Sequence, residues 1–397
     1  MRSPALRSAV GLGALALVLS AAAPTSAGPG AVDVPTLTGH AVLPAHTFVP
    51  ATEPSGAQLG TEPINGVTPP FADQPLQGFS GIVRRGDGTY EVLSDNGYGR
   101  KSNSADFALR VNRIVPDLAT GAIDVVGGFN LTDPAGHLPF PLTRPDRVLT
   151  GADLDVESIV RLRDGSYWMG DEFGPFMVHV DRAGRVLSPP VQPAGVTSPE
   201  HPDGGTPTLG RSKGFEALIA APDRRFLYPL LEGTVTGDPA GTLRLYEFDL
   251  RTGAFTDRRW AYRLAAPNLA IGDATAIDAN RFLVIERDSA QGDAAQVKRI
   301  YLVDRRDRDA DGAVDKTLLV DLLDVANPRR LGGFPETFRF PFDTIENVTL
   351  LDERTVVVVQ DNNFPFSNGR TPGVPDATEF ITVRLPASLH PDPRVLR

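Results

Sequence analysis

Acidic residues recur at matching places along this sequence, and they are the residues best suited to chemistry. Glu157 opens one apolar run and Asp171 with Glu172 closes the next, and this arrangement is repeated along the chain. The candidate metal ligands that it selects are Asp95, Asp171, Glu172, Glu232, Glu286, Glu346, Asp361 and Asn362. Converging carboxylates repel one another unless a cation compensates them. Ligation by oxygen alone predicts Ca²⁺ as the cofactor, because Zn²⁺ prefers His and Cys.

A repeated hairpin pattern is expected to position these residues. Each copy has an apolar strand, a polar turn, a second apolar strand and a closing acidic or amide group. The copies lie at Gly78–Gly97, Glu157–Glu172, Gly214–Gly233, Asp273–Asp288 and Ile345–Asn363. In an antiparallel hairpin the first residue of one strand lies beside the last residue of its partner. The acidic positions of all copies should therefore share one rim, although Asp-Gly and Asp-Asn-Gly are also ordinary turn formers.

Further strand-like runs after each hairpin predict an all-β fold with about four strands per unit. No helical periodicity is sustained, and four strands per unit is the content of a β-propeller blade. We expect five blades, or six if the Pro-rich stretch Pro50–Pro75 contains strands. The last copy has one clear trailing strand, so the run Leu37–Leu43 is expected to complete its sheet and close the ring.

Two further groups of residues are candidates for ion binding. Carboxylates at positions 1, 3, 5 and 9 of a calcium loop are Asp307, Asp309, Asp311 and Asp315, with Gly312 at position 6 and Leu318 in place of the closing Glu. A solvated charged loop is the alternative for that segment. Candidate phosphate-binding residues are Arg287, Arg100 and Lys213, since cationic side chains pair with phosphate oxygens. For Arg287, between Glu286 and Asp288, an internal salt bridge is equally consistent with the sequence.

Composition excludes several classes of function. The chain has no Cys, so disulfides, thiolate metal sites and Cys nucleophiles are absent. Its net charge of −10 argues against a nucleic-acid partner. The six His residues show no paired spacing, and Ser80 lacks the Gly-x-Ser-x-Gly context of a hydrolase nucleophile.

The first 27 residues have the pattern of a secretory signal: basic residues, an apolar run, then Pro-Thr-Ser-Ala. We expect cleavage near Ala27 and a secreted, monomeric protein with no membrane span. The expected organisation is a signal at 1–27, a closing strand and extended loop at 28–77, and a propeller domain at 78–397.

Several of the repeated motifs carry a family resemblance from about Gly78 to Leu385. They are Gly-Phe-Ser-Gly-Ile at 78–82, Ser-Asp-Asn-Gly at 94–97, Asp-Glu-Phe-Gly-Pro at 171–175, Gly-Phe-Glu-Ala-Leu at 214–218, Thr-Ile-Glu-Asn-Val at 344–348 and Gln-Asp-Asn-Asn-Phe-Pro at 360–365. With these motifs the chain resembles the phytase-like family with esterase-like activity, seen mostly in secreted bacterial proteins. The resemblance implies a propeller and phosphoester hydrolysis.

The resulting hypothesis is a calcium-dependent phosphoesterase acting on a small molecule. Rim carboxylates would hold the ion, and Glu157 or Glu216 would act as catalytic base. Two alternatives stand beside it: a lactonase or carboxylic-ester hydrolase using the same ring, and a propeller that binds a ligand without turnover.

Overall fold

Each sequence repeat forms the inner hairpin of one blade. The structure is a computed structural model, and it describes residue 1 and residues 33–308 and 312–397. Blade 1 contains β2 (Phe79–Arg84), β3 (Tyr90–Ser94), β4 (Arg110–Asp117) and β5 (Ala122–Asn130). Blade 2 contains β6 (Val156–Arg161), β7 (Tyr167–Asp171) and β8 (Met177–Val180). Blade 3 contains β9 (Phe215–Ala220), β10 (Phe226–Leu231), β11 (Thr242–Asp249) and β12 (Ala254–Arg263).

The remaining blades complete the set within the described residues. Blade 4 contains β13 (Ala270–Ala276), β14 (Arg281–Arg287), β15 (Lys298–Arg308) and β16 (Val314–Asp321). Blade 5 contains β19 (Ile345–Leu350), β20 (Thr355–Gln360), β21 (Thr378–Arg384) and β1 (Thr36–Leu43). The short elements are β17 (Val325–Ala326), β18 (Thr337–Phe338) and the 3₁₀ turns η1 (Ala57–Leu59), η2 (Gly292–Ala294) and η3 (Leu331–Gly333).

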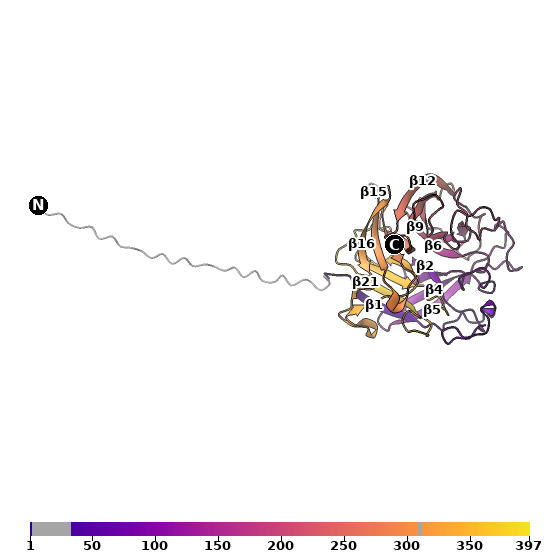
Figure 1. The fold of residues 1–397 in the computed structure, drawn as a ribbon, viewed down its shortest axis with the longest axis horizontal. Helices are drawn as coiled ribbons and strands as arrows, with labels where there is room; N and C mark the ends of the chain where they lie inside the picture. The colour runs from indigo at the N-terminus through magenta and orange to yellow at the C-terminus, as the bar shows by residue number, and fades with distance from the viewer. Residues whose placement is uncertain (2–32, 309–311) are drawn as a thin grey trace. The chain divides into compact units, whose positions relative to one another are not determined.

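The first strands of the five blades form a closed ring. Strand β2 lies beside β6, β6 beside β9, β9 beside β13, β13 beside β19, and β19 returns to β2. Figure 1 shows the blades arranged around this centre. The predicted β-propeller is therefore confirmed, with five blades in the described part of the chain. The alternative of six is wrong, because the stretch 50–75 holds isolated bridges and the turn η1 rather than a sheet.

The chain closes the ring with a strand from its N-terminal region. Strand β1 pairs antiparallel with β21, from Thr36 opposite Arg384 to Leu43 opposite Thr378. Blade 5 therefore combines segments from near both ends of the sequence, as the run Leu37–Leu43 predicted. A single parallel pairing of Val42 with Ala122 also joins β1 to blade 1.

The hydrophobic core is divided among the interfaces between blades. A separate cluster of buried side chains lies between each pair of adjacent blades. Strand β20 illustrates the result, because all of its residues from Thr355 to Gln360 are buried. A blade that packs on both faces needs apolar residues on both faces of its strands, and β-branched side chains suit such strands. The valine run Val356–Val359 follows this requirement.

Two predictions fall partly or wholly on residues that the structure does not describe. The signal at 1–27 lies outside the described residues. In the second calcium loop, Asp309 and Asp311 also lie outside them, as does the side chain of Asp307. Asp315 is described as an exposed residue of β16, opposite Asp304 of β15. Among the described residues no helix is long and apolar enough to cross a membrane.

Candidate metal centre

A β-bulge interrupts the pairing of the two innermost strands at the same place in every described blade. In blade 1 the pairing passes from Phe79 opposite Ser94 to Gly81 opposite Leu93, which leaves Ser80 without a partner. The residues left out in blades 1 to 5 are Ser80, Glu157, Glu216, Gly272 with Asp273, and Glu346. A bulge bends its strand and re-aims the extra side chain. This repeated bulge brings the first set of carboxylates to the channel.

The second set of residues comes from the ends of the partner strands. In each blade the residue that precedes the bulge pairs with the last or nearly last residue of the second strand. The next residues along the chain are Asp95, Glu172, Glu232, Arg287 and Asp361, and all of them line one cavity. Blade 4 therefore contributes a cation where the other four blades contribute a carboxylate.

The cavity at this mouth of the channel is small and strongly acidic. Its volume is about 200 Å³. The carboxylates that line it are Asp95, Asp155, Glu157, Glu172, Glu216, Glu232, Glu346 and Asp361. None of these eight residues is more than 8% exposed. The cationic residues of the lining are Lys213 and Arg287, and Asn96 and Asn363 add amides.

One group of carboxylates in the cavity has no cationic partner. One oxygen each of Asp95, Asp155 and Glu157 lie within 4.8 Å of one another. The backbone N–H of Gly97 donates to Asp95 Oδ1 at 2.9 Å, and Asn96 Nδ2 donates to Asp155 Oδ1 at 2.6 Å. Within the described chain, no Lys, Arg or His lies within ion-pair distance of these three carboxylates.

The first repeat begins with a glycine, Gly78, whose backbone lies against the carboxylate of Asp95. Gly78 has φ +71°, and a Cβ atom there would lie 2.0 Å from Asp95 Oδ1. Any other residue would meet both a backbone penalty and a collision with the carboxylate. Gly78 therefore leaves the space that the Asp95 carboxylate occupies.

A second group of carboxylates lies beside the two cations. One oxygen each of Glu172, Glu216 and Glu232 lie within 4.8 Å of one another. Lys213 Nζ forms an ion pair with Glu232. Among the described residues, Glu172 Oε1 and Glu216 Oε1 are buried and have no hydrogen-bond partner. Unpartnered buried carboxylate oxygens are costly, so each calls for an unseen cation, water or proton.

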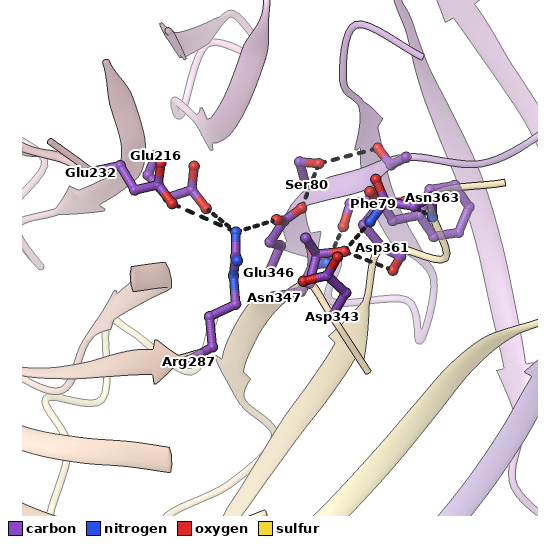
Figure 2. Close-up of polar contacts among 12 residues, drawn as sticks. Phe79, Ser80, Glu216, Glu232, Arg287, Asp343, Glu346, Asn347, Asp361 and Asn363 are labelled. Atoms are coloured by element: carbon purple, nitrogen blue, oxygen red, sulfur yellow. Dashed lines mark hydrogen bonds and ion pairs between the residues drawn. The ribbon is translucent and has the colours of Figure 1, made fainter. Parts of the chain in front are cut away.

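Arg287 reaches across the cavity to three carboxylates. Its Nη2 lies 3.0 Å from Glu346 Oε1, 3.6 Å from Glu232 Oε1 and 3.7 Å from Glu216 Oε1 (Figure 2). Ser80 Oγ donates to the other oxygen of Glu346 at 3.0 Å. Burial alone would lower the pKa of Arg287, but Glu346, Glu232 and Glu216 outweigh burial and raise it. Arg287 therefore stays charged as a built-in counter-ion.

Burial, and then the remaining negative charge, raises the pKa values of the acids. Burial, followed by the nearby Asp155, raises the pKa of Asp95 to about 7. Burial and several charges, Asp95 among them, raise the pKa of Glu346 to about 7 although Arg287 opposes this change. For Glu216, burial and then Glu232 raise the pKa well above its usual value. The pKa values of Glu157, Glu172 and Asp361 are raised in the same way, chiefly by burial. Such a site favours protons or a bound cation.

Two predicted ligands lie away from the cavity because the register places them one residue too early. Asp171 pairs with Val156 in the sheet, and its carboxylate accepts hydrogen bonds from the N–H groups of Asp155 at 2.8 Å and Gly174 at 2.6 Å. Glu286 accepts hydrogen bonds from Tyr262 Oη at 2.5 Å and from the Ala265 N–H at 3.0 Å. Adjacent residues of a strand point to opposite faces. Glu172 and Arg287, the next residues along, occupy the cavity instead.

Other predicted residues divide between the cavity and its surroundings. The structure brings Glu157, Glu216, Asp95, Glu172, Glu232, Glu346, Asp361, Arg287 and Lys213 together. Asn362 lies outside the lining, and its Nδ2 donates to the Asp376 carbonyl at 3.0 Å, whereas Asn363 lines the cavity. Arg100 is an exposed residue beside Gly99 and does not line the cavity.

Asp155 is the cavity residue that the repeat pattern missed. It precedes the bulged Glu157 by two positions, where blades 1 and 3 have Gly78 and Gly214. The equivalent positions of blades 4 and 5 are Ala270 and Thr344, so Asp155 is the one acidic residue at this place, and it becomes visible once the copies are aligned on the bulge.

Solved structures with a similar chain path are only distantly similar. A luciferin-regenerating enzyme is 10% identical with a TM-score of 0.38, and the match covers 78% of this chain and 80% of that one. The Dos1 propeller is 10% identical with a TM-score of 0.35, covering 79% and 69% of the two chains. An exo-β-1,3-galactanase from Phanerochaete chrysosporium is 10% identical with a TM-score of 0.42, covering 78% and 61%. At these values the likenesses carry no argument about function.

Sequence comparison gives a relative and a family. A protein of Arthroderma benhamiae named as an uncharacterized secreted protein is 27% identical over 225 residues, and the match covers 45% of this chain and 42% of that protein. This relative is not bacterial, so the resemblance is wider than the expected bacterial group. The profile of the phytase-like family, described as "Esterase-like activity of phytase", matches residues 74–364. Because this match spans most of the sequence and contains the repeats that build the acidic cavity, the chain belongs to the phytase-like family.

Proposed function

We propose that this protein is a calcium-dependent hydrolase of small phosphoesters and that the acidic cavity is its active site. The observation that carries the proposal is the pair of buried oxygens, Glu172 Oε1 and Glu216 Oε1, that accept no hydrogen bond in the described structure. They lie in a cavity whose eight carboxylates outnumber its two cationic side chains. Membership of a family described by esterase-like activity supports a hydrolytic reaction.

The donor set fits calcium. The polar side chains that line the cavity offer carboxylate, amide and hydroxyl oxygens, and no Cys or His is among them. Hard cations such as Ca²⁺ take six to eight oxygen ligands in flexible geometry. Asp95, Asp155 and Glu157 are the proposed primary ligands, because this group lacks a cationic partner of its own. A bound calcium ion would supply a positive charge that holds phosphate oxygens and lowers the pKa of a water molecule.

The other side of the cavity would bind and activate the substrate. Arg287 and Lys213 are charged donors on that side, and guanidinium and ammonium groups bind phosphate oxygens. Glu216 is the proposed base, since its Oε1 accepts no hydrogen bond in the described structure, lies 3.7 Å from Arg287 Nη2, and belongs to a carboxyl group whose pKa is raised by burial. In its ionised form, a carboxylate with a raised pKa is a stronger base than an ordinary carboxylate. Glu157 is the second candidate for the base, but its position beside Asp95 and Asp155 makes it better suited to bind the ion.

Hydrolysis of carboxylic esters or lactones is the second candidate activity, because the family description names an esterase-like activity. In that reaction the same cavity would polarise a carbonyl oxygen and direct a water molecule to the carbon. Ser80 is a poor nucleophile for such chemistry: its hydroxyl donates to Glu346, and in the described residues no His lines the cavity.

The test is turnover with and without calcium. Purified protein, stripped with EDTA, would be assayed on p-nitrophenyl phosphate and phytate, and on p-nitrophenyl acetate and a γ-lactone, before and after adding calcium. We expect calcium-dependent phosphate release that falls at least 100-fold in Glu216→Gln. Glu336→Gln, which removes an exposed carboxylate paired with Arg330, should keep full activity. Turnover of the carboxylic substrates alone would favour the second candidate, and no turnover at all would leave a binding propeller.

We also propose that the chain is exported, cleaved near Ala27 and monomeric. The similarity to a protein named as secreted supports export. N-terminal sequencing of protein collected from the culture medium would locate the cleavage site, and light scattering after size exclusion would give the mass in solution.

A further inference from the structure

The channel has a second mouth at the opposite ends of the inner strands. Strands β2, β6 and β9 begin at the acidic cavity and run to this mouth, about 15 Å away at the rise of an extended strand. A cavity of about 110 Å³ opens here, and residues 394–397 form part of its wall. Figure 1 shows the C-terminal end near the middle of the ring of blades.

This second cavity is strongly basic. The arginines that line it are Arg84, Arg85, Arg161, Arg224, Arg394 and Arg397. Among the described residues of the lining, Asp273 has the one acidic side chain, and its oxygens already accept hydrogen bonds from the N–H groups of Ala274 at 2.7 Å and Val348 at 2.8 Å. The two ends of the channel therefore carry opposite charge.

Several of these arginines have fewer carboxylate partners than their charges would need. Arg85 Nη1 lies 2.5 Å from Glu91 Oε1. Arg161 Nε lies 3.8 Å from Glu91 Oε2. This Nε atom is buried and, in the described structure, forms no hydrogen bond. The same Glu91 also pairs with Arg113 at 3.3 Å. One carboxylate thus serves three guanidinium groups. Arg84 donates to the backbone carbonyl of Leu396 at 3.2 Å, and no carboxylate of the described residues forms an ion pair with it.

Arg224 is the most unusual member of the group. It lies in the turn between β9 and β10 with φ +58°, and its N–H donates to the carbonyl three residues earlier. The equivalent turn positions of blades 1 and 2 are Gly88 and Gly165, with φ +87° and +89°. Left-handed backbone is unfavourable for a long side chain, and such strain is retained mainly at functional positions. In the placed part of the chain, the guanidinium of Arg224 has neither an ion pair nor a hydrogen bond.

We propose that this mouth is an anion site that binds a phosphate group, with Arg224 and Arg161 as its principal contacts and Arg84 beside them. The three arginines come from consecutive blades and line one small cavity, and guanidinium groups bind phosphate oxygens through paired N–H donors. This site is separate from the acidic cavity and does not depend on the function proposed for that cavity.

The test measures phosphate binding in the absence of calcium. Isothermal titration of inorganic phosphate into the EDTA-treated full chain should give saturable binding. Arg224→Gly should raise the Kd about tenfold or more, as expected when a charged donor pair is lost. The substitution suits the positive φ, so the variant should keep its unfolding temperature. Arg224→Asn, which also tolerates this backbone, is a second variant if the glycine variant folds poorly.

Controls separate this site from general electrostatics and from the acidic cavity. Arg251→Ala removes the same charge from a residue that is 74% exposed and should leave the Kd unchanged. Glu216→Gln should also leave it unchanged. Glycerol 2-phosphate, titrated in parallel, would assign the ligand as a phosphate ester if it binds, and as free phosphate if it does not. No binding to the original chain without calcium, or equal binding to Arg224→Gly, would overturn the proposal.

Discussion

Without a bound cation, the stability of this protein should fall as the pH rises. The folded-state pKa of Asp95 is raised from 3.8 to about 7, chiefly by burial. A group with a raised folded pKa binds its proton more tightly in the folded state, so it stabilises the fold below about pH 4 and loses this contribution by about pH 7. Glu346 has the same sign, from 4.5 to about 7.

The size of the effect follows from the pKa difference. About three pKa units at 1.36 kcal/mol per unit give about 4 kcal/mol for Asp95 alone. With an unfolding entropy of about 2.1 cal/mol/K per residue, this corresponds to a fall of about 5 °C in the unfolding temperature. His179 acts in the opposite direction, because burial lowers its pKa, but it is a single group. Above pH 7 bound calcium should replace the protons and restore the stability.

The assay is thermal unfolding at several pH values from 5 to 8, in EDTA and in calcium. We expect the EDTA curve to fall with pH and the calcium curve to stay level, with the gap widest at pH 8. Asp95→Asn should flatten the EDTA curve, while Glu336→Gln, at an exposed site, should not. An unfolding temperature in EDTA that is constant or rises from pH 5 to 8 would refute this reasoning.

Two further predictions concern the residues at the strand ends. Arg287→Met should raise the KM for a phosphoester. It should also lower the free energy of unfolding in EDTA by about 3–5 kcal/mol, because Glu346 loses its cationic partner in a buried site. A urea titration in which the variant matches the original chain would contradict this prediction. Glu172→Gln should weaken calcium binding measured by titration, because it removes a negative charge from the cavity that would hold the ion, although Glu172 is not one of the proposed primary ligands. Asp171→Asn should leave calcium binding intact and lower stability by about 1–3 kcal/mol through its lost hydrogen bonds. The reverse ranking of these two variants for calcium would mean that the register assigned to blade 2 is incorrect.

The fold could be predicted from the sequence because its signal is repeated and local. Each hairpin has two apolar strands and a polar turn, and alternation within a strand needs no knowledge of the rest of the chain. Closure by Leu37–Leu43 followed from counting strands, because the last copy had too few. Blade 2 departs from the expected four strands: β8 (Met177–Val180) is its last, and isolated bridges to Val186 and Val191 take the place of a fourth.

The site was less predictable because it depends on register. Asp171 and Glu172 are neighbours in the sequence, and only the pairing of Val156 with Asp171 shows which one faces the cavity. Similarly, Glu286 pairs with Ile271, so Arg287 is the residue that enters. A bulge shifts this register by one residue in each blade, and composition alone gives no sign of where it lies.

Blade 4 accounts for the asymmetry of the acidic cavity. Its bulge contains two residues, and Asp273 is directed to the backbone N–H groups of Ala274 and Val348 instead of to the cavity. The same blade supplies Arg287 where its sisters supply acids. A fully symmetric ring of carboxylates would hold cations but would repel an anionic substrate. By removing one acid and adding one guanidinium, blade 4 leaves Asp95, Asp155 and Glu157 unpaired for a cation and gives the opposite wall a donor for a negatively charged group. This division of charge within about 200 Å³ is what a phosphoester and its metal ion together would require.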